Sequence, residues 1–439
     1  MRPRSWSLML LLVVAGILAS YALLGRSVPN LSAAAGQAVP VKATQEIGGQ
    51  EEWGPYEVVS PFPLPLPDGP DGVKHDGWTW GSVGAVYAET PDRIWIAQRG
   101  ELPLPPGSKP WTPYAMLPWK NVDAIGPPSQ QPPDAPGRKA TGYDDGESAS
   151  GGVEAKRGWE RRYHHSVFAV DRNGKMIDWW PDAEKLFDVR RGRGPHSIKM
   201  SPYDPEKHIW IIDDELHMVY KFTHDGKLVQ KWGEQGVPGR DGNHFSRPTG
   251  IDFLPDGTFF ISDGYVGTRV AKFDKNGKFL MDWGKKAADA KNPGPNEFST
   301  VHAITISKDR RLFVSDRGHK RIQVFDENGK FLYMFSTGAN SSPYYDLISG
   351  DQYLWVADGG TQRILKYDLN GHYLYGWGRY GPWLGGFYGP HAMTVDQDKN
   401  LYVGDVFGGR VHKFRPKPNA DPAKVMQPEL KPPMTDRTQ

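Results

Sequence analysis

Short apolar runs alternate with polar turn residues over most of the chain. One run in each repeat ends in an Asp, and a second run ends in an aromatic residue about nine or ten positions later. The Asp residues, which recur every 42 to 53 positions, are Asp213, Asp263, Asp316, Asp358 and Asp405. The aromatic residues that follow them are Phe222, Phe273, Phe325, Tyr367 and Phe414. Runs this short, bounded by turn residues, predict β-strands rather than helices.

A tight turn follows the aromatic residue in each repeat. Asn-Gly or Asp-Gly pairs stand at residues 173–174, 225–226, 276–277, 328–329 and 370–371. Such pairs between apolar runs are a strong signal for a β-hairpin. A further apolar run precedes each strand that ends in Asp, so the repeat holds four strands. Four short strands in 40 to 50 residues are typical of a propeller blade.

The number of blades follows from one further unit upstream. Residues 94–98 occupy the place of its second strand, and residues 167–171 that of its third. We therefore predict an all-β, six-bladed β-propeller over residues 76–416. The last blade stops after its third strand at Phe414, so we expect a strand near residues 56–60 to complete it and close the ring.

Four segments lie outside the predicted blades. Residues 1–38 hold Arg2 and Arg4 followed by an apolar run, which is typical of an export signal or a retained membrane anchor with its linker. Residues 39–75 are Pro-rich, residues 101–160 form a polar insertion that we interpret as a long loop, and residues 417–439 are expected to be a disordered tail. Export would place the propeller in the periplasm or outside the cell, and both the cleaved and the anchored form stay open.

Composition narrows the possible partners. The net charge of +2 comes from 53 basic and 51 acidic residues spread along the chain, which argues against a nucleic-acid partner. The chain has no Cys, so it has neither a lipoprotein anchor nor a disulfide. Small or peptidic partners are more plausible, and we expect a monomer.

One position in each blade, the start of the innermost strand, suggests a metal site. It lies 14 residues before the end of the second strand in five blades and 17 residues before it in the second blade. Blades two, four and six carry His196, His302 and His391 there, and blades one, three and five carry Gly84, Thr249 and Tyr344. Alternate blades of a six-fold ring are a third of a turn apart, so the three imidazoles should converge on the axis. A single His would more often cap a strand or pack on a neighbour, but this joint placement favours a three-histidine zinc site with an open fourth position. Iron, copper and nickel are alternative metals for the same three ligands.

The loops that follow the second strands open at the same end of the channel. They bring in Arg99 from blade one, Tyr265 from blade three and Arg317 from blade four. Two guanidinium groups could bind a carboxylate, and a phenol beside a metal and two cations could act as a base. The alternative is that Arg317 pairs with Asp316 and that Tyr265 is a core aromatic residue.

Other polar residues are expected to be structural. The second-strand Asp residues should bond the backbone within each blade. The remaining histidines that we weighed fall outside the channel and are expected to be surface or strand residues; they are His164, His165, His217, His319 and His412.

These motifs resemble the peptidyl-α-hydroxyglycine α-amidating lyases, which are six-bladed propellers of the NHL-repeat type. The resemblance spans about residues 76–414 and rests on short stretches around the candidate residues. These stretches are 98–100, 194–196, 262–265 with Arg269, 301–302, 316–317 with 321–323, and 389–391. In that family three histidines hold zinc, at positions that match His196, His302 and His391. The catalytic tyrosine matches Tyr265, and the two active-site arginines match Arg99 and Arg317.

The resemblance implies a carbon–nitrogen lyase that cleaves a peptidyl-α-hydroxyglycine into a peptide amide and glyoxylate. The substrate would be a peptide or a small amide with a terminal carboxylate. Zinc would bind its hydroxyl, Tyr265 would take the hydroxyl proton, and the arginines would hold the terminal carboxylate. Animal members have an Asp directly after the third histidine that binds a structural calcium ion. This chain has Ala392 there, which argues against calcium.

Two other classes of function compete with the lyase. A non-catalytic NHL propeller would bind a protein or polymer ligand and would hold no metal on its axis. A metal-dependent propeller hydrolase would hold calcium with Asp, Glu and Asn side chains, whereas this axis carries histidines. Metal content and glyoxylate release together distinguish the three.

Overall fold

The computed structural model describes residues 52–69, 72, 74–75, 78–103, 163–187, 194–381 and 383–429. The chain divides into a segment Met1–Ile47 and a unit Gly48–Gln439. The signal or anchor expected at residues 1–38 and residues 104–160 of the expected insertion lie outside the described residues. Within the described ranges, none of the helices is long and apolar enough to cross a membrane.

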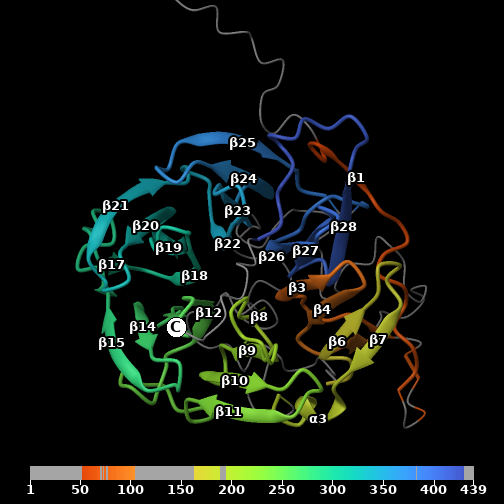
Figure 1. Ribbon diagram of the computed structural model, residues 1–439, viewed down its shortest axis with the longest axis horizontal. Coiled ribbons are helices and arrows are strands. Elements are labelled where there is room, and N and C mark those ends of the chain that lie inside the picture. The colour runs from red at the N-terminus through yellow and green to blue at the C-terminus, as the bar shows by residue number, and fades with distance from the viewer. Residues whose placement is uncertain are drawn as a thin grey trace, which may run out of the picture. The chain divides into compact units, whose positions relative to one another are not determined.

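Six four-stranded antiparallel sheets surround a central axis (Figure 1). This arrangement confirms the six-bladed β-propeller. Blades one to three are β3 (Ala85–Thr90), β4 (Arg93–Ala97), β6 (Val167–Val170) and β7 (Met176–Trp179); β8 (Ser197–Met200), β9 (Ile209–Asp213), β10 (Met218–Phe222) and β11 (Leu228–Trp232); and β12 (Pro248–Phe253), β13 (Phe259–Asp263), β14 (Arg269–Phe273) and β15 (Phe279–Trp283). Blades four and five are β18 (Val301–Ile306), β19 (Leu312–Asp316), β20 (Arg321–Phe325) and β21 (Phe331–Ser336); and β22 (Pro343–Ile348), β23 (Leu354–Asp358), β24 (Arg363–Tyr367) and β25 (Tyr373–Trp377).

The sixth blade joins the two ends of the propeller. It consists of β26 (Pro390–Val395), β27 (Leu401–Asp405), β28 (Arg410–Pro416) and β1 (Tyr56–Val58). β1 pairs antiparallel with β28, with Tyr56 opposite Pro416 and Val58 opposite Phe414. The Tyr56 ring is fully buried, 5.5 Å from the ring centre of Trp377 in blade five. Closing the ring with an early strand leaves blade six with a complete sheet.

Short elements complete the described part of the chain. β2 (Trp78–Thr79) pairs antiparallel with β5 (Leu102–Pro103), and β16 (Lys285–Lys286) pairs parallel with β17 (Glu297–Phe298). The helical turns are α3 (Pro181–Glu184) and the 3-10 helix η5 (Arg317–His319).

The hydrophobic core lies between neighbouring blades. Each of six buried clusters combines side chains from two adjacent sheets, and together they run round the whole ring. Between blades two and three, for example, Trp210 stacks on Trp232 at 4.9 Å and also contacts Phe259 at 4.9 Å. Because every blade is packed on both sides, the inner strands that carry the channel residues are held firmly in place.

The hairpin turns help to hold adjacent blades together. Gly277 has a positive φ of 84°, which the Asn-Gly turn requires, and a Cβ atom there would lie 2.5 Å from the Trp232 ring. Trp232 Nε1 also donates a hydrogen bond to the Gly277 carbonyl at 3.0 Å. The glycine is therefore needed both for the turn and for close packing on the previous blade.

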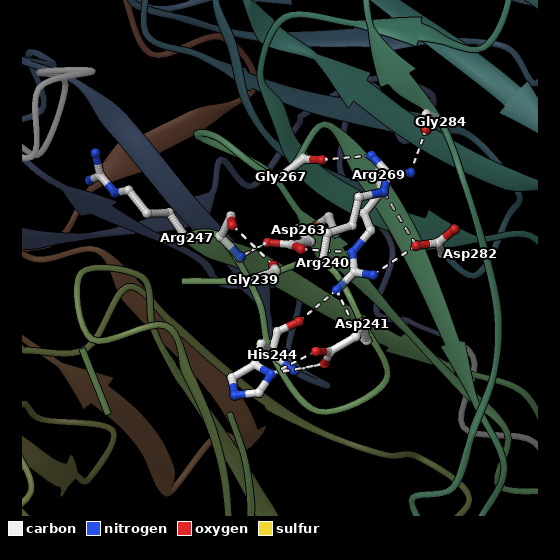
Figure 2. Close-up of polar contacts among 12 residues, drawn as sticks. Gly239, Arg240, Asp241, His244, Arg247, Asp263, Gly267, Arg269, Asp282 and Gly284 are labelled. Carbon is white, nitrogen blue, oxygen red and sulfur yellow. Dashed lines mark hydrogen bonds and ion pairs between the residues drawn. The ribbon is translucent and has the colours of Figure 1, made fainter. Parts of the chain in front are cut away.

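The second-strand Asp residues bond the backbone, as expected. Asp263 is buried, accepts a hydrogen bond from the Ser246 amide at 2.7 Å, and pairs with Arg269 Nε at 2.8 Å. Figure 2 shows Arg269 reaching on to Asp282 and to the carbonyls of Asp241 and His244. The same kind of contact, from a loop amide to the Asp, recurs at Asp316, Asp358 and Asp405. These carboxylates fix the loops at the entrance of blades three to six.

The end of the described chain differs from the expected disordered tail at 417–439. Val425 and Met426 are buried in the cluster between blades five and six, and the Met426 amide donates to Tyr56 Oη at 2.9 Å. The Pro428 carbonyl accepts from the Gly350 amide at 2.9 Å. The reason is hydrophobic: these two apolar side chains complete the core of the closing blade, a local feature within a segment that is polar on average.

Candidate metal centre

The three channel histidines meet on the axis of the propeller. His302 lies in β18, His391 in β26, and His196 immediately before β8. Their ring centres are 4.7 to 5.1 Å apart, and all three side chains are buried. One nitrogen from each ring lies within 4.8 Å of the others, which is close enough to bind a common metal ion. The structure therefore brings together the residues that the spacing singled out.

β-Bulges direct two of these side chains into the channel. The pairing of β18 with β19 shifts register between Val301 and Ala303, so His302 is the extra residue. The pairing of β26 with β27 shifts in the same way around His391. A bulge turns one side chain out of the regular alternation of a strand, and bulges occur often beside active sites.

The intervening blades orient the imidazole rings. The Nδ1 atoms lie 3.0, 2.6 and 2.8 Å from the backbone carbonyl oxygens of Thr249, Tyr344 and Gly84, in the order His196, His302 and His391. A carbonyl can only accept a hydrogen bond, so each Nδ1 carries the proton and each Nε2 keeps its lone pair. A hydrogen bond from Nδ1 to a backbone carbonyl fixes the orientation of the ring and prepares Nε2 to bind a metal. In the described part of the chain the buried His391 Nε2 has no hydrogen-bond partner, as a ligand atom would.

Electrostatics also favour the neutral form of these rings. Burial and the positive charge of Arg99 lower the pKa of His391 to about 3. Burial and Arg317 likewise hold the pKa of His302 well below its usual value. Neutral imidazole is the form that binds metal ions, so both rings are ready to act as ligands at neutral pH.

Tyr265 lies directly at this centre. Its hydroxyl is 2.9 Å from His302 Nε2 and 3.2 Å from His196 Nε2. Two guanidinium groups face its ring, with Arg247 at 4.3 Å and Arg317 at 5.0 Å from the ring centre. The alternative of a plain core aromatic does not account for a hydroxyl placed against two candidate ligands. The surrounding cations stabilise negative charge on the phenol oxygen.

Both predicted arginines reach the same region. Arg99 is fully buried, and its Nη2 lies 3.7 Å from Asp214 Oδ1. Arg317 begins η5 and also lies over the Tyr344 ring at 5.2 Å. The Asp316 carboxylate is instead bound by Arg321 at 2.9 Å and by His319 at 2.7 Å, which argues against the alternative of an Arg317–Asp316 pair.

Sequence reasoning missed two residues of this site. Arg247 binds Asp214 through Nη2 at 2.7 Å and lies over the Tyr265 ring. Figure 2 shows its side chain pointing away from Asp263 and Arg269. Asp214 directly follows the end of the second strand in blade two, the position of Arg99 and Arg317 in blades one and four. Comparing this position in all six blades would have found Asp214. Arg247 gave no repeat signal, because it stands in a loop before β12.

The site therefore combines three kinds of chemistry. Three imidazole nitrogens can hold a metal ion and leave a coordination position open. A phenol within hydrogen-bond distance of two of them can transfer a proton. The guanidinium groups can bind an anionic group of a substrate.

Comparison with known proteins gives a consistent result. No family model matches the chain. Peptidyl-glycine alpha-amidating monooxygenase B of Xenopus laevis is 29% identical over 245 residues, which cover 51% of this chain and 26% of that protein. A probable peptidyl-alpha-hydroxyglycine alpha-amidating lyase of Caenorhabditis elegans is 33% identical over 162 residues, which cover 36% of this chain and 43% of that protein. The matches thus span less than half the length of these two relatives.

Among solved structures, a streptogramin B lyase is similar with a TM-score of 0.45 and 13% identity, over 82% of this chain and 97% of that chain. Two of the sequence relatives are named as peptidyl-α-hydroxyglycine α-amidating lyases. More particularly, they confirm the resemblance to the peptidyl-α-hydroxyglycine α-amidating lyases that the motifs indicated.

Proposed function

We propose that this protein is a zinc-dependent lyase that cleaves a peptidyl-α-hydroxyglycine into a peptide amide and glyoxylate. The observation that carries the proposal is the position of the Tyr265 hydroxyl, 2.9 and 3.2 Å from two of three converging histidines. A base, a metal-binding set and cationic side chains are thereby joined in one buried site. The names of the amidating-lyase relatives support the reaction class.

The three histidines would hold zinc through their Nε2 atoms, since their Nδ1 atoms are bonded to backbone carbonyls. Zinc bound there would act as a Lewis acid toward the hydroxyl oxygen of the substrate. Imidazole ligands suit zinc, and the axis offers three of them at ligand spacing.

Tyr265, ionised to the phenolate, would take the proton from the substrate hydroxyl. The electron pair of that O–H bond then forms the carbonyl of glyoxylate, and the C–N bond breaks with its electrons moving to the amide nitrogen. The nitrogen needs one proton to become the amide, and Tyr265 can return the proton it received. The reaction therefore consumes no net acid or base.

The arginines would hold the glyoxylate half of the substrate. Arg317, which lies over the Tyr265 and Tyr344 rings, is near the candidate base and can bind the carboxylate. Arg99 is buried beside Asp214, and its positive charge lowers the pKa of His391. Two cations around one anionic group position the substrate and stabilise charge formed in the transition state.

The direct test combines metal analysis with product detection. The purified protein should contain zinc at the three-histidine centre and should release glyoxylate from a synthetic peptidyl-α-hydroxyglycine. A metal-loaded protein that is inert toward such peptides would reject the lyase function and leave the propeller fold unaffected. A protein without metal at this centre would favour a non-catalytic binding propeller.

A further inference from the structure

A second group of candidate ligands lies away from the channel. His75, Glu101 and His165 are all buried, and one ligand atom from each lies within 4.8 Å of the others. Both Nδ1 atoms approach the same carboxylate oxygen, Glu101 Oε1, at 3.0 Å for His75 and 2.9 Å for His165. The prediction that His165 is a surface or strand residue is therefore wrong: it is fully buried, because its ring packs on Trp179 at 4.4 Å.

We propose that His75, Glu101 and His165 form a second divalent metal site, with zinc the metal best suited to it. Two imidazoles and one carboxylate are a common ligand set for zinc. With bonds of about 2.0–2.1 Å, neighbouring ligand atoms around tetrahedral zinc lie about 3.3 Å apart. The two Nδ1 to Oε1 distances, 3.0 and 2.9 Å, need only a small expansion to reach that spacing.

The position of the ring protons differs between a hydrogen-bonded and a metal-bound cluster. The Nε2 atoms of His75 and His165 are buried and have no hydrogen-bond partner within the described part of the chain. Metal binding through the two Nδ1 atoms would replace their hydrogen bonds to Glu101 and place the ring protons on Nε2, so the Nε2 atoms lack a partner in the described part of the chain in either state. A divalent ion bound there would offset the negative charge of the buried Glu101 carboxylate.

The site would connect parts of the chain that are distant in sequence. His75 is 26 positions before Glu101, and His165 is 64 positions after it. A metal bound by all three would act as a cross-link, which matters in a chain that has no Cys for disulfides. Glu101 is two residues after Arg99, so the cross-link would also fix the loop that places this arginine in the channel.

This proposal does not depend on the lyase function, and metal counting tests it separately. Zinc-loaded protein, measured by mass spectrometry of the metal, should contain about two ions per chain. His302→Ala should retain one ion, and adding His165→Ala to that variant should remove it. His165→Ala alone should lose one ion, and its melting temperature should fall on the order of 5 °C.

A matched control uses another His–Glu contact. His224 Nε2 lies 2.8 Å from Glu89 Oε2 without a second imidazole, so His224→Ala should keep both ions. Should His165→Ala fail to fold, Glu101→Gln provides the same test with a side chain of equal size. In the His302→Ala background, Co²⁺ should give the visible absorption of a four-coordinate ion, and Glu101→Gln should abolish it. A parent protein with a single ion, or a Glu101→Gln variant that binds metal as well as its parent, would show a hydrogen-bonded cluster only and would overturn the proposal.

Discussion

The replacement of Tyr265 by Phe probes the centre most directly. It removes one oxygen and leaves the aromatic ring between Arg247 and Arg317, whose guanidinium carbons lie 4.3 and 5.0 Å from its centre. The lost contacts are those from the hydroxyl to His302 and His196, at 2.9 and 3.2 Å. Since the three histidines do not need this hydroxyl to bind metal, the variant should fold and keep its zinc.

The size of the effect follows from the role of the oxygen. A general base contributes roughly 10²- to 10⁴-fold to the rate, so kcat should fall by that factor. One lost neutral hydrogen bond changes stability by about 1 kcal/mol, which is too little to unfold the protein. KM should change much less than kcat, because the arginines that we propose to hold the carboxylate remain.

The assay is glyoxylate release under saturating and limiting substrate, with the metal content measured on the same samples. Tyr344→Phe is a useful comparison, since the Tyr344 ring also contacts Arg317 and lies 5.4 Å from the His302 ring centre. It should lose far less activity than Tyr265→Phe. A Tyr265→Phe enzyme with kcat within about threefold of the parent would refute the assignment of Tyr265 as the base.

Four further predictions test other parts of the structure. His302→Ala should lose the channel metal and glyoxylate release together, and a variant that binds zinc as tightly as the parent would reject the site. Arg317→Ala should keep the metal and slow turnover by about 10²-fold, as measured by kcat against metal content. Burial raises the pKa of Asp346 from 3.8 to about 7, so the stabilisation from its protonated form is present below pH 4 and is lost as pH rises to about 7. The shift corresponds to a loss of about 4 kcal/mol in the free energy of unfolding between these pH values. Asp346→Asn should therefore raise the melting temperature more at pH 8 than at pH 4. We also propose that the propeller is exported, so a reporter enzyme active only in the cytoplasm and fused after Asp436 should be inactive.

The blade count could be predicted because the repeat is local. Each hairpin depends on its own turn, such as Lys275-Asn276-Gly277-Lys278, and on the apolar run on either side. The axial position was equally accessible, since a fixed offset from the second-strand Asp identifies the start of the inner strand. His302 and His391 obey this offset and are the extra residues of their bulges.

The contacts between blades could not be predicted in the same way. Arg247 contacts Tyr265 and Asp214 from a loop. Its positive φ of 66° is unusual for an arginine, so the sequence did not predict this loop conformation. The His75–Glu101–His165 cluster joins three segments that no repeat relates. The burial of Val425 and Met426 depends on the gap that they fill beside Tyr56, which is visible only when the ring is closed.

The geometry of the channel explains why alternate blades carry the histidines. Six equivalent positions surround the axis, and three of them hold imidazole rings. The other three, Thr249, Tyr344 and Gly84, supply the backbone carbonyls that fix those rings. Because the carbonyl alone orients the ring, the side chains at these three positions differ, from a hydrogen atom to a phenol. An imidazole at all six positions would keep these backbone carbonyls but would crowd the axis, where the centres of the three rings already lie 4.7 to 5.1 Å apart.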